Sequence, residues 1–195
     1  GIGIVALLAA CALLIRVAGP EADDRIPLAI LTLVAVSGPL VNSLREGNTT
    51  HFILLLLAAA VLLLRARRDV TAGIVLGFCA TFKLPLFLLL AYFAWRNRWR
   101  VMAGSALSSG GLFGLSIGVF GWAAHVSWFE LCVAPFLAGT IPAFNVQSID
   151  GFLMRLDTGT RLLREWEPLA RPMVQSIVRA AILVVLFGAA YLAFR

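Results

Sequence analysis

The chain has 195 residues, of which 61% are hydrophobic and 13% are charged, and its formal net charge at pH 7 is +6. Soluble globular domains carry about 25% charged residues, so this chain has too little polar surface to cover its apolar side chains in water. The composition excludes a cytosolic enzyme and a disordered protein, and it predicts an integral membrane protein. The arginines lie in short clusters between apolar runs, as in cytoplasmic loops of membrane proteins, so we expect no nucleic-acid binding.

The apolar runs predict an all-α fold, a polytopic bundle of transmembrane helices forming one domain. A span needs about 20 apolar residues. The expected spans are residues 2–15, 27–44, 48–64, 70–95, 101–120 and 173–194, with an outer loop over residues 121–172. Because the chain starts at Gly1 inside an apolar run, we expect it to be the later part of a longer protein.

The run over residues 70–95 is interrupted in its middle by Lys83-Leu84-Pro85, where proline cannot continue helical hydrogen bonding. Each half of about 12 residues measures roughly 18 Å, too short to cross ~30 Å of hydrocarbon. Two arginine clusters flank the run, and both are expected on the cytoplasmic side: Arg65, Arg67 and Arg68 before it, and Arg96, Arg98 and Arg100 after it. We therefore favour a re-entrant hairpin of two half-length helices over the alternative, a single kinked span with one cluster outside.

Apolar residues recur at helical spacing inside the outer loop and predict an interfacial helix on the outer leaflet, which Gly159 and Pro168 weaken. These apolar residues are Phe152, Leu156, Leu163, Trp166 and Ala170. Glycines at four-residue spacing are interpreted as helix-packing positions and not as a phosphate loop. They are Gly73 and Gly77 in one run, and Gly110, Gly114 and Gly118 in another.

Lys83 is the first candidate for a binding role, because a charged group inside an apolar run is costly. Near mid-depth, its ammonium group would pair with an anion that enters from the lipid, such as the phosphate of a lipid-linked substrate. The alternatives are extension to an interface or pairing with a carboxylate.

Two polar stretches on the outer side supply further candidates. Asn48 and His51 lie in a polar turn at the start of a span, where Asn48 is also a good helix cap. In the outer loop, amide and hydroxyl groups can bind a sugar, and arginine suits a phosphate; the alternative is a solvated loop. These loop residues are Asn145, Gln147, Ser148 and Arg155. No spacing of His, Cys or acidic residues predicts a metal site, and we expect no cofactor.

Taken together, these motifs resemble glycosyltransferase family 87, a family of multi-pass bacterial membrane enzymes. The resemblance is carried by Gly47-Asn48, the arginine cluster ending at Arg68, Phe82-Lys83-Leu84-Pro85, Arg96-Asn97-Arg98-Trp99-Arg100, and Asn145-Val146-Gln147-Ser148 with Gly151 and Arg155. Family members usually have Gln where this chain has Asn48. Their catalytic acid lies in the first outer loop, and no position here matches it.

The resemblance implies transfer of a hexose, typically mannose, from a polyprenyl-phosphate donor to a glycolipid or glycan acceptor at the outer face of the bacterial inner membrane. The general base is expected upstream of Gly1, so the chain by itself is expected to be inactive. Lys83 and Arg155 would hold the departing phosphate, while Asn48, His51 and the outer-loop polar residues would contact substrate. Half of a secondary transporter, whose broken helices bind substrate at mid-membrane, and a non-catalytic membrane subunit are the competing interpretations.

Overall fold

The computed structural model describes residues 1–19, 25–143, 146, 148–159, 161–170 and 172–193. The described chain is helical almost throughout, which confirms the predicted all-α class. It divides into two compact units, Gly1–Val119 and Phe120–Arg195.

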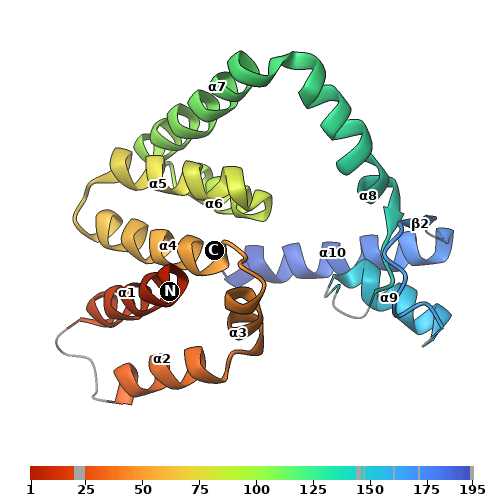
Figure 1. Ribbon diagram of the computed structural model, residues 1–195, viewed down its shortest axis with the longest axis horizontal. Helices are drawn as coiled ribbons and strands as arrows, with labels where there is room; N and C mark the ends of the chain where they lie inside the picture. Colours follow the sequence, from red (N-terminus) through yellow and green to blue (C-terminus); the bar gives the residue numbers. More distant parts are fainter. Residues whose placement is uncertain (20–24, 144–145, 147, 160, 171, 194–195) are drawn as a thin grey trace. The chain divides into compact units, whose positions relative to one another are not determined.

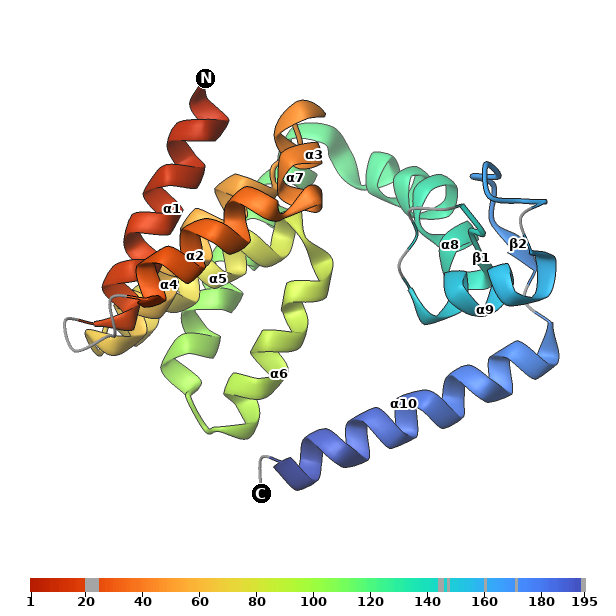
Figure 2. The same ribbon diagram turned by 90° about the horizontal axis from the view of Figure 1, so that it is seen from below.

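The first unit is built around α4, which lies between α1 and α5 (Figures 1 and 2). Its elements are α1 (Ile2–Ala18), α2 (Arg25–Val36), α3 (Gly38–Arg45), α4 (Thr50–Arg65), α5 (Asp69–Phe82), the 3-10 turn η1 (Leu84–Leu86), α6 (Phe87–Trp95) and the first part of α7 (Trp99–Cys132). A cluster of Ala60, Leu76, Leu90 and Val101 brings α4, α5, α6 and α7 together. Burial of these side chains stabilises the unit.

The apolar run over residues 27–44 does not form one continuous helix, because the helix is interrupted at Ser37. The backbone of Ser37 is extended there, with φ −72° and ψ 95°. Its hydroxyl accepts a hydrogen bond from the amide of Leu40 at 3.4 Å and caps α3. Pro39 lies in the first turn of α3, where amide groups have no partner within the helix. Because proline has no amide hydrogen, no hydrogen bond is lost when the new helix starts there.

The helix break at Lys83-Leu84-Pro85 is confirmed, and the chain returns to the end where it started. Arg98 Nη2 lies 2.9 Å from Asp69 Oδ1, so the start of α5 and the start of α7 are joined by a salt bridge. A single kinked span over residues 70–95 would hold these two groups a whole helical segment apart. The segment is therefore a hairpin, and both arginine clusters lie at the same end of the unit.

Close contact of α5 and α7 depends on glycine. A Cβ atom at Gly73 would overlap the carbonyl oxygen of Val101, and one at Gly77 would overlap that of Ser105. The Ser105 hydroxyl donates a hydrogen bond of 2.9 Å to the carbonyl oxygen of Gly73. Gly104 likewise lies against the carbonyl oxygen of Val70, a contact that the glycine spacing did not reveal. The packing role expected for Gly73 and Gly77 is confirmed.

The second glycine series does not pack in this way. No described atom lies within 4 Å of a Cβ built at Gly110, Gly114 or Gly118, apart from their own local backbone. The expectation that this series forms a helix contact within the described chain is therefore wrong.

In the part of the chain that the structure describes, two helical stretches are long and apolar enough to cross a membrane, namely Trp99–Leu137 and Met173–Ala193. The expected span over residues 101–120 matches the first part of α7, which is interrupted at Gly121 by a φ of 79°. Helix resumes after this residue and carries exposed Trp122, Trp128 and Leu131. The loop expected from residue 121 therefore begins as helix, and apolar side chains exposed over this length suit contact with lipid.

The second unit contains the rest of α7, α8 (Ala134–Ala138), β1 (Gly139–Thr140), α9 (Ile149–Thr158), β2 (Leu169–Ala170) and α10 (Met173–Ala193). The two short strands are antiparallel, with Gly139 opposite Ala170. The interfacial helix predicted from the apolar spacing is present only as α9. It ends before Gly159, whose φ is 59°, so Leu163, Trp166 and Ala170 do not continue it.

We expect the substitution Gly73→Ala to lower the unfolding free energy of the detergent-solubilised protein by about 1–3 kcal/mol, because the added methyl group meets backbone that cannot move aside. Thermal unfolding followed by circular dichroism measures the effect. Gly110→Ala is the matched control, since nothing described lies within 4 Å of its Cβ position. Equal midpoints for the two variants would contradict the close packing of α5 and α7.

The hairpin also predicts which positions share a side of the membrane. In a Cys132→Ser background, cysteines at Arg67 and Arg96 should react with an impermeant maleimide from one face of oriented vesicles, and a cysteine at Thr49 from the other. All three positions are exposed, and the remaining cysteines, Cys11 and Cys79, are buried. Labelling of positions 67 and 96 from opposite faces would be incompatible with the hairpin.

Candidate functional site

Lys83 lies at the point where the hairpin turns. Its φ of −131° and ψ of 85° end α5, and Pro85 then starts η1. The amide of Lys83 donates to the carbonyl oxygen of Cys79 at 2.9 Å, and its carbonyl oxygen accepts from Leu86 at 2.9 Å. Its backbone is thus fixed on both sides of the break, and the side chain extends from the tip.

Asn48 is held by the turn that leads into α4. Its amide donates to the carbonyl oxygen of Ser43 at 2.8 Å. Its side-chain oxygen accepts from the amide of Thr50 at 3.2 Å and from the hydroxyl of Thr50 at 3.0 Å. The N-cap position of α4 is Thr49, which makes no side-chain hydrogen bond, so Asn48 does not cap the helix and instead fixes the turn before it.

The structure brings Lys83 and Asn48 together across 35 residues of chain. Lys83 Nζ donates a hydrogen bond of 3.3 Å to Asn48 Oδ1. Among the described residues, no carboxylate forms a salt bridge with Lys83. An ammonium group has three N–H donors, so two remain beyond the one that Asn48 accepts. The pair presents a positive charge and hydrogen-bond donors suited to an anion.

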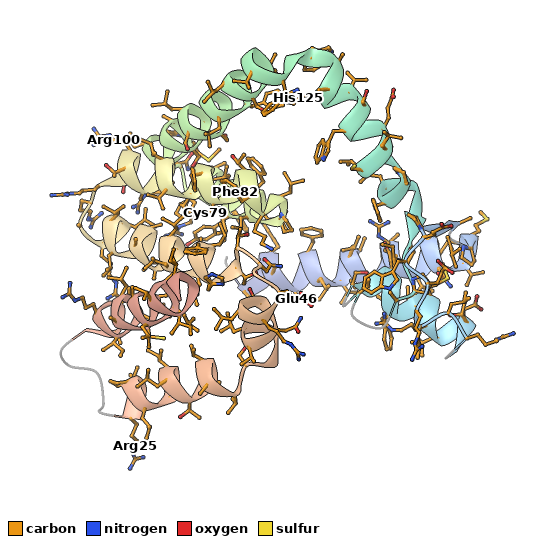
Figure 3. The ribbon with its side chains drawn as sticks, in the orientation of Figure 1. Arg25, Glu46, Cys79, Phe82, Arg100 and His125 are labelled. Carbon is orange, nitrogen blue, oxygen red and sulfur yellow. The ribbon has the colours of Figure 1, made fainter. Side chains whose placement is uncertain are left out.

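The length of α5 sets how far Lys83 lies from the arginine clusters. α5 has 14 residues, about 21 Å at the usual helical rise, between the arginine end and Lys83. Figure 3 places Arg100 at one end of the helices and Phe82 and Glu46 at the other. Lys83 therefore lies at the end of the unit opposite the arginine clusters. The side chain is partly exposed, not enclosed.

His51 and Ser43 add two buried polar groups near the same turn. His51 is 3% exposed and Ser43 is 5% exposed. His51 Nδ1 and Ser43 Oγ have no hydrogen-bond partner. His51 packs against the backbone of α1, because a Cβ at Gly3 would lie 2.7 Å from its Nε2. Sequence reasoning missed Ser43, whose signal was a hydroxyl inside an apolar run.

The outer-loop candidates in the second unit have local structural partners. Arg155 Nη1 donates to the carbonyl oxygens of Ala143 at 3.0 Å and Val146 at 2.8 Å. The hydroxyl of Ser148 caps α9 by accepting from the amide of Gly151 at 3.0 Å. Arg155 therefore stabilises the loop that contains Ala143 and Val146 by donating hydrogen bonds to its backbone carbonyl groups. Two further candidates, Asn145 and Gln147, lie outside the described residues.

Two further polar features of this unit were not found from the sequence. Arg179 Nε lies 3.4 Å from Asp150 Oδ1, which ties α10 to α9. Gln175 Nε2 lies 3.9 Å from the sulfur of Met154, and its Oε1 is buried without a partner. Across the part of the chain that the structure describes, no group of three His, Cys, Asp or Glu side chains could hold a metal ion.

Comparison with known proteins identifies the family. No curated protein matches the chain, and no solved structure does. The sequence model of glycosyltransferase family 87, in contrast, matches residues 1–195. This match covers the re-entrant hairpin, the Asn48 turn and the outer loop together. The chain therefore belongs to glycosyltransferase family 87, a family of membrane glycosyltransferases.

Proposed function

We propose that the chain forms part of an enzyme that transfers a hexose, namely mannose, from a polyprenyl-phosphate donor to a glycolipid or glycan acceptor. The reaction takes place at the outer face of a bacterial inner membrane. The observation that carries the proposal is the contact between Lys83 and Asn48 at the tip of the hairpin. It provides a cation for the donor phosphate at the end of the unit opposite the arginine clusters.

The reaction needs a general base and a stabilised leaving group. The base removes the proton of the acceptor hydroxyl while its oxygen forms a bond to the anomeric carbon of the sugar. The bond from that carbon to the phosphate oxygen breaks, and the polyprenyl phosphate leaves with the electron pair. The charge on this leaving group rises in the transition state, so a fixed ammonium group beside it accelerates the step. In this proposal Lys83 has that role.

Asn48 holds the Lys83 ammonium group in place. Three donors converge on its side-chain oxygen: the amide of Thr50, the hydroxyl of Thr50 and Lys83 Nζ. This leaves the side-chain nitrogen of Asn48 as a donor directed away from these three groups. That nitrogen can bind a second phosphate oxygen or a sugar hydroxyl.

His51 and Ser43 suit the recognition of hydroxyl groups. Their buried atoms lack partners, and an unpaired buried polar atom costs about 1–3 kcal/mol. Because both atoms are covered and His51 packs against α1, a sugar hydroxyl would remove that cost only where binding opens this packing. No carboxylate among the described residues pairs with Lys83, so the pair supplies the phosphate contact and leaves the general base unassigned.

Family membership argues against the competing interpretations. The hairpin alone suits both a glycosyltransferase and a transporter, because both use helices broken within the membrane. The family match extends over residues 1–195, however, and assigns the chain to the transferases. We therefore set aside the transporter and the non-catalytic subunit.

Lys83→Met in the full-length enzyme should lower kcat/KM for a polyprenyl-phosphate mannose by about 100-fold or more, the usual loss for one transition-state donor. Lys83→Arg, which keeps the positive charge, should retain more activity. Radiolabelled sugar transfer in membranes measures both variants. Unchanged turnover in Lys83→Met would remove Lys83 from the site.

Asn48→Asp tests the charge of the pair. A carboxylate at this position would neutralise the Lys83 ammonium group and repel the donor phosphate, because the atom it replaces lies 3.3 Å from Nζ. We expect a larger rise in KM for the donor than in Asn48→Ala, which only removes the hydrogen bond. Equal KM values for the two variants would show that Lys83 does not bind the phosphate through its charge.

Arg155→Gln should act mainly on stability. Hydrogen bonds from charged groups contribute about 1.5–3 kcal/mol, and the substitution weakens those to Ala143 and Val146. The thermal midpoint should fall, and proteolysis should increase near residues 143–146. A loss of donor affinity at an unchanged midpoint would instead indicate direct contact between Arg155 and phosphate.

A further inference from the structure

Two turns at the end of the first unit opposite Lys83 have the same geometry. After α4, Arg67 has a φ of 59°, and the amide of Arg68 donates to the carbonyl oxygen of Leu63 at 2.9 Å. After α6, Asn97 has a φ of 53°, and the amide of Arg98 donates to Phe93 at 2.9 Å. Both are the helix-ending motif that usually contains glycine at the left-handed position.

The two turns lie next to one another and concentrate positive charge. The salt bridge from Arg98 to Asp69 joins the second turn to the residue that follows the first. Arg65 donates to the carbonyl oxygen of Val17 at the end of α1. The remaining arginines of the two turns are exposed and pair with no described carboxylate. We call these four residues the arginine surface: Arg67, Arg68, Arg96 and Arg100.

Tryptophan side chains border this surface, and a leucine lies further along α6. Trp95 and Trp99 flank the second turn and are 51% and 63% exposed. Leu88, two helical turns before Trp95 on α6, is 69% exposed. Indole rings favour the level of lipid headgroups, and leucine favours acyl chains. The order of guanidinium, indole and aliphatic groups from the arginine surface along α6 matches the layers of a phospholipid leaflet.

We propose that the arginine surface binds the phosphodiester headgroups of anionic phospholipids. Guanidinium groups bind phosphate oxygens through paired hydrogen bonds and keep their charge at all physiological pH values. Asp69 is already neutralised by Arg98, so it does not compete for the other arginines. This lipid site is separate from the donor site at Lys83, and it does not depend on the proposed function.

Fluorescence quenching by brominated lipids tests the proposal. In the full chain, every tryptophan except Trp95 and Trp99 is replaced by phenylalanine, and the protein is reconstituted in mixtures of phosphatidylglycerol and phosphatidylcholine with one of the two brominated. We expect a relative binding constant of about 3 or more in favour of phosphatidylglycerol. The preference should fall as salt is raised, because the interaction is electrostatic.

Variants assign that preference to the four arginines. In the combined variant R67Q/R68Q/R96Q/R100Q the relative binding constant should approach about 1, whereas the corresponding Arg→Lys variant should keep most of the preference. The control R161Q/R164Q removes two exposed arginines from the second unit and should leave the preference unchanged.

Three results would overturn the proposal. They are an unchanged preference in the four-glutamine variant, an equal loss in the control, and displacement of the brominated lipid by water-soluble glycerol phosphate, which would indicate a site for free phosphate. If the four-glutamine variant does not fold, the proposal is tested by the salt dependence of the parent protein. A preference for phosphatidylglycerol that does not change with salt then overturns it.

Discussion

The organisation of the first unit depends on the interruption of one helix. Pro85 has no amide hydrogen and cannot continue the hydrogen bonding of α5, so the helix ends at Phe82 and the chain turns at Lys83. The turn alone would leave two short helices in an apolar medium. The Asp69–Arg98 salt bridge and the glycine contact of α5 with α7 hold the returning chain against the outgoing one. The break therefore produces a hairpin with a charged side chain at its tip.

This hairpin separates two kinds of positive charge. The ammonium group of Lys83 is single, partly exposed and hydrogen-bonded to a neutral amide. The other end of the hairpin carries several guanidinium groups in two neighbouring turns, and that of Arg98 is already paired with Asp69. The 16 residues of α4 span the distance between these ends, about 24 Å at the usual helical rise. A phosphate bound at one end is thus too far from the other to be shared.

Local chemistry determined which parts of the fold could be predicted. Proline at position 85 and glycine at positions 73 and 77 act on the backbone directly, and their consequences follow from the sequence. The break at Ser37 was missed because serine and Gly38 within an apolar run are also compatible with a continuous helix. The helix after Gly121 was missed because the tryptophans there suit both an interfacial loop and a helix. Nothing in the local pattern distinguishes these alternatives.

The candidate site shows the same limit at the level of side chains. Lys83 and Asn48 were both selected from the sequence, but their contact spans 35 residues and depends on the return of the hairpin. Arg155 was selected for the same chemical reason as Lys83, namely a cation suited to phosphate. Its Nη1 donates to two backbone carbonyl groups, which need a donor wherever a loop lacks regular structure, so the structure adds a bracing role that the sequence did not predict. Whether a cation binds substrate or braces a loop is decided by the backbone groups that surround it, and residue type and spacing do not report those groups.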